Sequence, residues 1–345
     1  MPRTVSGLWD EVVSWDNLVG AYFDARRSKR FKTDVMRFHR QWEENLLNIH
    51  NHLVWGSWEP KPFKVFPVHE PKERVIEAPA FSDRVVHHAM HRVLSPYFER
   101  RFIQHSYACR PGKGTHWATY AVQKMLRKAK RRWGRAYVLQ ADISKYFPSI
   151  DHDVFMQQAA RTIGDRRVLG LWEQIVRDRG VQGVGLPVGA LTSQLAANVY
   201  LDPLDHHVTD DLGHGLYARY MDDWVVIGPS KAALRDVLAH LRGWLWDKLR
   251  LKLSRYHIYP ASKGVDFAGY RTWATHRLPR KSNAKRARRR IKRLARLCAR
   301  GQDKEETLRA VKASFYGYTK FCSASTVWNE IERDLADIYS PAPGF

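Results

Sequence analysis

The stretch that decides the fold is Leu216-Tyr217-Ala218-Arg219-Tyr220-Met221-Asp222-Asp223-Trp224-Val225-Val226-Ile227. Two apolar segments, 216–220 and 224–227, flank an adjacent pair of aspartates. Short β-rich segments separated by a few turn residues predict a β-hairpin, so Asp222 and Asp223 are expected at its tip. An acidic turn is a common surface feature, so this signal is weak when taken alone.

A third aspartate strengthens the signal. Asp142 ends the apolar segment 136–142, which predicts a buried strand. If that strand and the hairpin share one sheet, the acids converge at one end of it. Phosphoryl transfer by two divalent ions needs carboxylates gathered at one rigid edge. We therefore expect Asp142, Asp222 and Asp223 to be catalytic.

The rest of the chain mixes helical and β patterns, which predicts the α+β class. Residues 9–55 have helical spacing, and 61–80 predict a hairpin interrupted by prolines. Further helices are expected over 82–102, 154–163, 166–177, 193–212 and 231–249, and further strands over 252–259 and 265–273.

Charge points to nucleic acid as the partner. The chain has 345 residues, a formal net charge of +23 and a pI near 10.1, which attracts polyanions. The segment 267–302 contains no acidic residue, so a basic helical piece is expected from about Leu278 onward. No signal peptide or membrane-spanning pattern is found, so a cytoplasmic protein without membrane contact is expected. Three scattered cysteines form neither a disulfide framework nor a zinc motif.

Five motifs in order resemble those of reverse transcriptases. Tyr220-Met221-Asp222-Asp223 is similar to their polymerase box, and 142–151 to their first aspartate motif. The other three are 106–115, 185–194 at the place of the nucleotide pocket, and 265–270, which is similar to a primer-grip hairpin. The resemblance implies a right-hand polymerase with fingers, a palm with an antiparallel sheet, and a helical thumb. We expect a helical N-terminal extension over 1–60, fingers and palm over 61–277, and a basic thumb over 278–345.

The resemblance also implies roles at the reacting centre. Asp142 and Asp222 would bind two Mg²⁺ ions, the main-chain oxygen of Ile143 would assist, and Asp223 would tune the site. A primer hydroxyl would attack the α-phosphate of a dNTP. Phe147 occupies the place of the ribose steric gate, with a core aromatic as the alternative. The pocket residues would be Val188, Gly189 and Gln194.

Basic side chains are expected around this centre. Lys72 and Arg74 would reach the triphosphate, although a solvated charged turn explains them equally well. Contacts with template or primer backbone are expected from Arg110, Lys113, Thr115, Gly269 and Tyr270, and contacts with the duplex from Lys285, Arg289, Lys292 and Arg293.

The pocket motif departs from the commonest pattern in the family. Val188-Gly189 followed by Ser193-Gln194, together with Met221 in the box and the stretch 105–116, is similar to the enzymes of diversity-generating retroelements. In those enzymes an aliphatic residue at the Val188 position accompanies errors at template adenines. That likeness implies a bacterial or phage gene, a template RNA copied into cDNA, and a small basic accessory protein. An antiphage defence enzyme and a group II-like maturase stay open. A non-catalytic RNA-binding protein with a polymerase fold is the alternative from another class.

Overall fold

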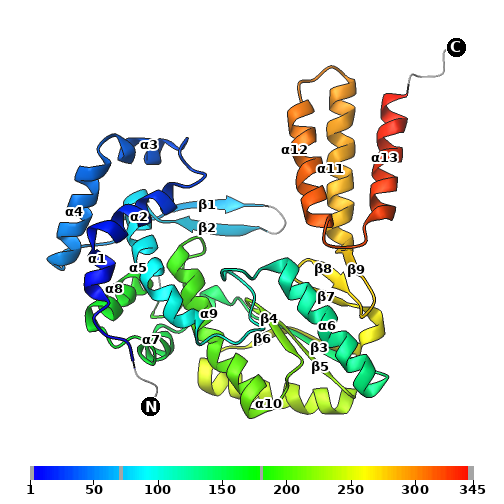
Figure 1. Cartoon of the computed structure of the whole chain (residues 1–345), viewed down its shortest axis with the longest axis horizontal. Helices are drawn as coiled ribbons and strands as arrows, with labels where there is room; N and C mark the ends of the chain where they lie inside the picture. Colours follow the sequence, from blue (N-terminus) through cyan, green and yellow to red (C-terminus); the bar gives the residue numbers. More distant parts are fainter. Residues whose placement is uncertain (1–3, 70–72, 179–181, 341–345) are drawn as a thin grey trace. The chain divides into compact units, whose positions relative to one another are not determined.

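The computed structural model describes residues 4–69, 73–178 and 182–340 (Figure 1). Helices and antiparallel strands are mixed along the chain, which confirms the α+β class. The chain divides into two compact units. The first comprises residues up to 110, 141–215 and 238–255, and the second comprises 111–140, 216–237 and the residues from 256 onward.

The first unit begins with the expected N-terminal helices. They are α1 (Trp9–Val13), α2 (Trp15–Arg26), α3 (Thr33–Arg40) and α4 (Trp42–Val54), and α2 packs on α5 (Phe81–Glu99). Tyr22 is fully buried, and its ring stacks on those of Phe38 and Trp42. The aromatic residues at helical spacing in this segment therefore form a core.

The same unit holds further helices and the hairpin interrupted by prolines. Strands β1 (Lys64–Val68) and β2 (Arg74–Ala78) pair antiparallel, with Lys64 opposite Ala78. Next come α7 (His152–Ala160), α8 (Arg166–Arg177) and α9 (Leu191–His206), which continues into a π-helical turn, His207–Asp211. Asp151 and Asp165 cap α7 and α8 by accepting hydrogen bonds from main-chain amides. Helix α9 is buried along most of its length.

Four strands form the central sheet in the order β4-β5-β3-β6. Their bounds are β3 (Tyr137–Ile143), β4 (Tyr217–Tyr220), β5 (Asp223–Gly228) and β6 (Leu253–Pro260), and α10 (Lys231–Leu249) lies between β5 and β6 in sequence. The strand and the hairpin predicted to share one sheet do so. Residues of α6 (Thr115–Trp133) contact β4 and β5.

Helix α6 was not expected, although its sequence contains a helical apolar stripe. Ala118, Val122, Met125 and Ala129 are buried at spacings of three and four. The motif 106–115 ends at the first residue of this helix, and no motif covers the periodic segment that follows it. Apart from the expected backbone contact of Thr115 at its start, this helix has no role predicted from sequence.

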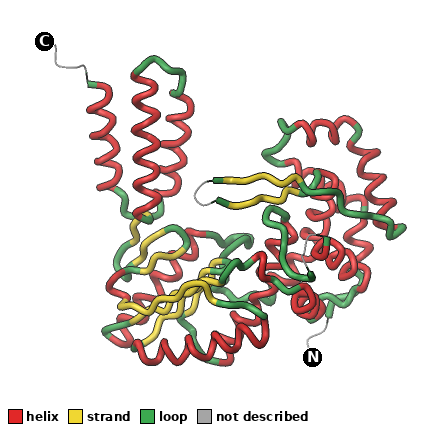
Figure 2. Tube along the Cα trace, turned by 180° about the vertical axis from the view of Figure 1, so that it is seen from behind, coloured by secondary structure: helices red, strands yellow, loops and turns green. Residues whose placement is uncertain are grey.

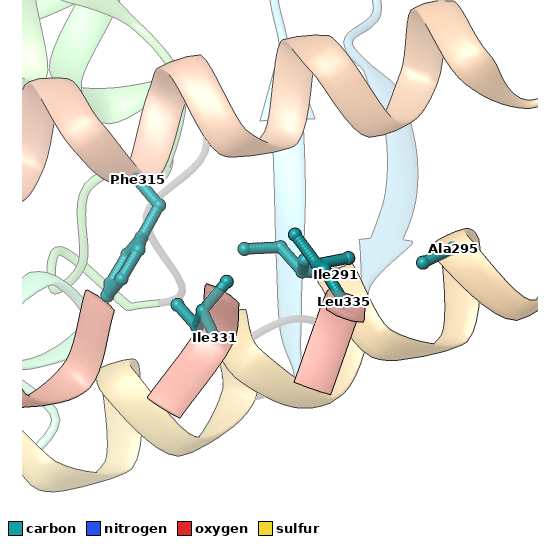
Figure 3. Close-up of a cluster of buried hydrophobic side chains, with 5 residues drawn as sticks. All are labelled: Ile291, Ala295, Phe315, Ile331 and Leu335. Atoms are coloured by element: carbon teal, nitrogen blue, oxygen red, sulfur yellow. The ribbon is translucent and has the colours of Figure 1, made fainter. Parts of the chain in front are cut away.

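The second unit ends in a small sheet and a helical bundle. Strands β7 (Val265–Phe267), β8 (Tyr270–Thr272) and β9 (Arg277–Pro279) pair antiparallel, and α11 (Lys281–Ala299), α12 (Glu305–Thr319) and α13 (Ser325–Tyr339) follow as an all-helical segment (Figure 2). The apolar core of the bundle is drawn in Figure 3: Ile291, Ala295, Phe315, Ile331 and Leu335. The basic helical piece is thus three helices around a core of their own. The sequence predicts disorder over residues 340–345, of which 341–345 lie outside the described residues.

No helix in the described part of the chain is both long enough and apolar enough to cross a membrane.

Candidate active site

The acidic pair lies at the hairpin tip, as the sequence predicts. Tyr220 pairs with Asp223, which leaves Met221 and Asp222 as a two-residue turn. Met221 has φ +57°, a left-handed conformation that costs roughly 1–3 kcal/mol in a residue other than glycine. The fully buried Arg219 donates from Nη1 to the Met221 carbonyl oxygen at 3.0 Å. A buried guanidinium therefore supports the turn that carries Asp222, a role that sequence reasoning missed.

Gln140 on β3 orients the second aspartate of the pair. Its amide nitrogen donates to Asp223 Oδ1 at 3.2 Å and to the carbonyl oxygen of Asp266 at 2.7 Å. Its amide oxygen accepts a 3.0 Å hydrogen bond from Tyr259. Burial raises the pKa of Tyr259, which keeps that hydroxyl protonated and able to donate. Both ends of the Gln140 amide are thus used, so its position is well defined.

Asp142 lies two residues beyond Gln140 on β3. Alternation along a strand places the two side chains on the same face, and both are partly exposed. Ser254 on β6 donates from its hydroxyl to Asp142 Oδ2 at 3.0 Å. Ser144 donates its amide to the Lys252 carbonyl oxygen at 2.8 Å, which fixes the chain after Ile143. Gln140 and Ser254 were not identified from sequence, since neither belongs to a motif.

The donor chemistry of the predicted metal ligands suits Mg²⁺, which prefers carboxylate and carbonyl oxygens. Asp142, Asp222, Asp223 and the Ile143 carbonyl supply only such atoms. Over residues 4–69, 73–178 and 182–340, no three His, Cys, Asp or Glu side chains gather closely enough to hold a metal ion. Joint metal binding by the three aspartates is therefore a proposal, taken up below.

The loop after Asp142 packs against the predicted nucleotide-pocket motif. The Leu186 amide donates to the carbonyl oxygen of Phe147 at 2.9 Å, and the Gly185 amide to that of Ile150 at 2.8 Å. The His152 Nε2 atom contacts the Gly185 carbonyl oxygen at 2.7 Å. Phe147 is half-buried in a short 3₁₀ turn. Two of the predicted motifs therefore form one hydrogen-bonded unit.

The pocket motif also contacts the β1–β2 hairpin. The Glu77 amide donates to the Val188 carbonyl oxygen at 2.9 Å. Gly189 has φ +135°, and a Cβ there would lie 2.9 Å from the Glu77 carbonyl oxygen, so only glycine fits without displacement. Arg74 is exposed at the start of β2, and Gln194 is half-buried in α9. Lys72 lies outside the described residues.

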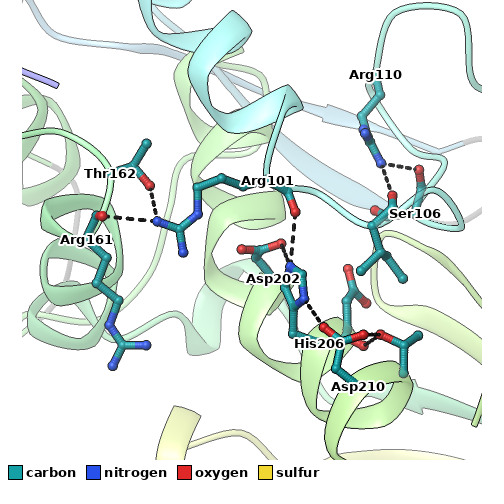
Figure 4. Close-up of polar contacts among 11 residues, drawn as sticks. Arg101, Ser106, Arg110, Arg161, Thr162, Asp202, His206 and Asp210 are labelled. Carbon is teal, nitrogen blue, oxygen red and sulfur yellow. Dashed lines mark hydrogen bonds and ion pairs between the residues drawn. The ribbon is translucent and has the colours of Figure 1, made fainter. Parts of the chain in front are cut away.

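Arg110 stabilises its own loop instead of facing solvent (Figure 4). Its side chain is only 4% exposed and forms an ion pair with Glu99 at 2.9 Å. Its Nη1 donates to the carbonyl oxygens of Ile103 and Ser106. The expected template contact is thus not open to this guanidinium as the loop stands. Lys113 lies in the loop before α6, and Thr115 is the first residue of α6.

The side chain of Tyr270, which is expected to contact template or primer, is also buried. Its hydroxyl donates to the Tyr318 carbonyl oxygen at 2.7 Å and contacts His116 Nδ1 at 2.9 Å. Burial lowers the pKa of His116, so the imidazole is neutral near pH 7. The hydroxyl of Tyr318 donates to the Gly269 carbonyl oxygen. In this conformation the Tyr270 ring is buried, and the Gly269 carbonyl oxygen also accepts a hydrogen bond from the Arg280 amide at 3.1 Å.

Helix α11 separates its basic residues into two groups. Lys285, Arg289 and Arg293 recur every four residues on one exposed face. Lys292 instead forms an ion pair with Asp334 at 2.8 Å, and the neighbouring Arg288 with Asp334 at 2.6 Å. These cations hold the pKa of Asp334 below its usual range. The expected duplex contact of Lys292 thus competes with an internal partner.

The aspartates thus lie on strands and a turn of one four-stranded sheet, and the loop after Asp142 is hydrogen-bonded to the pocket motif. Comparison with known proteins identifies the family. A sequence model described as "Reverse transcriptase (RNA-dependent DNA polymerase)" matches residues 64–272. The chain belongs to this family. Its fold class is that of a right-hand polymerase, and its matched domain is that of an RNA-directed DNA polymerase. Members of the family generally use divalent metal ions.

Several curated proteins are similar to parts of this reverse transcriptase. Protein YkfC of Escherichia coli is 27% identical over 266 residues, which cover 65% of this chain and 70% of that protein. Nuclear intron maturase 1 of Arabidopsis thaliana is 33% identical over 106 residues, which cover 30% of this chain and 14% of that protein. Group II intron-encoded protein LtrA of Lactococcus lactis is 27% identical over 177 residues, which cover 48% of this chain and 28% of that protein. The chain thus spans only a small part of the two intron proteins.

Among solved structures, telomerase from Candida albicans, in complex with a fragment of telomeric RNA, aligns with a TM-score of 0.49. The sequence identity is 13%, and the alignment covers 83% of this chain and 62% of that one.

Proposed function

We propose that this reverse transcriptase makes cDNA on an RNA template by two-metal phosphoryl transfer, with Asp142, Asp222 and Asp223 as the acids of the site. The observation that carries the proposal is the hydrogen bond from Gln140 to Asp223, because Asp142 is the next residue on the same face of β3. Asp142 and Asp223 are far apart in the sequence. Strand β3 brings them into one region, because it carries Asp142 and also Gln140, which contacts Asp223.

The three acids have two kinds of role in the proposed site. Asp142 and Asp222, with the main-chain oxygen of Ile143, would hold two Mg²⁺ ions, while Asp223 tunes the charge from its place beside Gln140. When bound, the ions would neutralise charge on the transferring phosphoryl group. The chain itself positions the primer end and dNTP and supplies no nucleophile.

The dNTP would bind against the two interlocked loops. Phe147 would exclude a ribose 2′-hydroxyl, and Val188, Gly189 and Gln194 would line the base and sugar. Arg74 on β2 would reach the triphosphate, and so would Lys72. The hydrogen bond between Glu77 and Val188 supports this grouping, because it ties the hairpin to the pocket motif.

Template and primer would follow basic and backbone groups of the second unit. The exposed face of α11 with Lys285, Arg289 and Arg293 would contact phosphates, as would Lys113 and Thr115 near the start of α6. We divide the chain into an N-terminal extension (1–60), fingers and palm (61–277) and thumb (278–345). The separate core of the α11–α13 bundle supports the last boundary.

The finer proposal is mutagenic retrohoming of a diversity-generating retroelement in a bacterium or phage. It rests on Val188 and Gln194, since replacing a glutamine amide by an aliphatic side chain removes hydrogen bonds around the incoming nucleotide. A small basic accessory protein and a structured template RNA would take part. Val188→Gln should reduce misincorporation opposite template adenines, measured by sequencing cDNA. Unchanged errors would rule this mechanism out.

A group II-like intron enzyme is the second candidate, supported by the similarity to LtrA and to nuclear intron maturase 1. An antiphage defence enzyme is the third. The surrounding genes separate the three. A template and variable repeat pair favours the retroelement, flanking intron RNA favours the maturase, and an isolated gene with a noncoding RNA favours defence.

Primer extension tests directly whether the protein is an RNA-directed DNA polymerase. Purified protein with Mg²⁺, an RNA template, a DNA primer and dNTPs should extend the primer, and Asp222→Ala should not. Asp236→Ala, which removes an exposed carboxylate of α10, is the matched control. No extension by either protein would favour a non-catalytic RNA-binding protein. Equal extension by wild type and Asp222→Ala would show that the synthesis does not come from the proposed site.

A further inference from the structure

Helix α6 carries an exposed face that the proposed active site leaves without a role. Two aromatic and four basic side chains point to solvent at spacings of one, three or four residues, so they lie on one side of the helix. This set, called here the α6 face, consists of Trp117, Tyr120, Lys124, Arg127, Lys128 and Arg131. From first to last residue it extends about 21 Å at the rise of an α-helix.

The charge of the α6 face is not compensated. Residues 115–133 contain no aspartate or glutamate, and within the described residues none of the four basic side chains forms an ion pair. Helix α10 has the same length of 19 residues but includes Asp236 and Asp247 among its basic residues. A helix that only needs to be solvated usually mixes both signs. The α6 face is therefore suited to a polyanion.

The aromatic residues add a second type of contact. Tyr120 lies beneath two cations, with Lys124 Nζ at 4.6 Å and Arg277 Cζ at 5.8 Å from its ring centroid. Trp117 packs edge-on against Tyr120 at 5.9 Å. It remains 56% exposed. Large aromatic rings are usually buried. An exposed indole beside a row of cations is the arrangement that stacks on unpaired bases while phosphates meet the basic groups.

We propose that the α6 face binds a single-stranded segment of RNA, with a base stacked on Trp117 and phosphates along Lys124, Lys128 and Arg131. The inference rests on the proposed function, in which part of the template RNA is not yet paired with cDNA. A duplex keeps its base faces stacked and cannot use Trp117. An acidic protein segment would satisfy the cations but has no base to offer the indole.

The test measures binding of a short labelled single-stranded RNA to the full chain by fluorescence anisotropy. Trp117→Ala should weaken binding about 5- to 50-fold, whereas Trp117→Phe, which keeps a ring, should restore most of the loss. Binding of duplex RNA should change little in either variant. An equal loss for duplex RNA would overturn the proposed stacking on an unpaired base.

Charge is tested with two matched pairs of substitutions. The double variant Lys124→Gln and Lys128→Gln should make the dependence of log K on log salt shallower by about 1.4. The control pair Lys231→Gln and Arg235→Gln lies at the same i, i+4 spacing on exposed positions of α10 and should leave the slope unchanged. Equal slopes for the two double variants would overturn the proposal.

Two further measurements separate the remaining explanations. If Trp117→Ala leaves RNA binding unchanged while Lys124→Gln and Lys128→Gln weaken binding of polyglutamate, the surface serves an acidic protein and the RNA proposal fails. Primer extension is run on the same preparations. Absence of extension by the wild type would count against the proposed function. If the wild type extends the primer but the α6 variants bind RNA as well as the control variant does, only this inference fails.

Discussion

The β4–β5 hairpin and helix α11 both carry charged side chains, but the protein holds those of the hairpin in place and leaves several of those on α11 exposed. At the hairpin, Arg219 supports the Met221 carbonyl and Gln140 orients Asp223. On α11, Lys285 and Arg289 face solvent with no protein partner in the described part of the chain. A reaction needs groups held in one orientation, whereas exposed cations can bind any of several phosphates along a nucleic-acid backbone. The hairpin region should therefore be sensitive to single changes and α11 tolerant of them.

The largest effect is expected at Asp142. Asp142→Asn removes a proposed metal-binding charge and should reduce kcat roughly a thousandfold in primer extension. Ser254→Ala removes only the hydroxyl that orients Asp142, so a loss of roughly tenfold is expected. Similar losses for the two variants would mean that Asp142 acts through its hydrogen bond and not through its charge.

Gly189 tests the contact between the pocket motif and the β1–β2 hairpin. Gly189→Ala places a Cβ 2.9 Å from the Glu77 carbonyl oxygen and should raise the KM for dNTP about tenfold by displacing the hairpin. Gly183→Ala is the control, because Gly183 also has positive φ, +80°, but open space around it. Equal KM values in the two variants would show that strain, and not the close contact, matters.

Gln140 tests whether orientation of Asp223 matters for turnover. Gln140→Leu removes the donor to Asp223 and should lower kcat up to about tenfold with little change in the KM for dNTP. Tyr259→Phe removes only the hydrogen bond to the Gln140 oxygen and should have a smaller effect in the same direction. A rise in KM without a change in kcat would contradict this role.

A smaller effect is expected on α11. Of two nearby cations, Arg289 should affect the affinity for duplex and Lys292 the stability of the fold. Arg289→Gln should weaken duplex binding a few-fold, reduce the salt slope by about 0.9 and leave the melting temperature unchanged. Lys292→Gln breaks an ion pair with Asp334 and should lower the melting temperature slightly. Identical behaviour of the two variants in both assays would remove the distinction drawn between them.

The smallest effect concerns acid stability of the bundle. Arg288 and Lys292 lower the pKa of Asp334 in the folded chain, so folding favours the ionised carboxylate. This contribution is complete above the usual aspartate pKa of about 3.9 and is lost as pH falls through the lower folded value. Melting temperatures measured from pH 6 down to about 2 should therefore fall less steeply in Asp334→Asn. Parallel curves would contradict the shift.

Local patterns predicted much of the fold. Helices α8 and α10 begin and end at the expected residues, and β3 and the β4–β5 hairpin were expected from apolar periodicity and turn residues. Helix α6 was not predicted although its apolar stripe is regular, since more than half of its 19 residues are polar or basic and the motif 106–115 ends at its first residue. Helix α9 ends at His206, where a π-helical turn begins, and no residue pattern signalled that change.

The sequence by itself determined the family and predicted the reacting centre, because residue type and spacing within short motifs carry that information: the aspartates, the pocket glycine and the excess of basic residues. Only the tertiary structure decided which other polar groups contact the predicted residues. Gln140 and Asp223 are 83 residues apart, and Tyr270 and Tyr318 are 48 apart. Arg110, Tyr270 and Lys292 have partners within the protein. Periodicity is a property of neighbours along the chain, whereas a hydrogen bond between distant residues depends on how strands and loops pack.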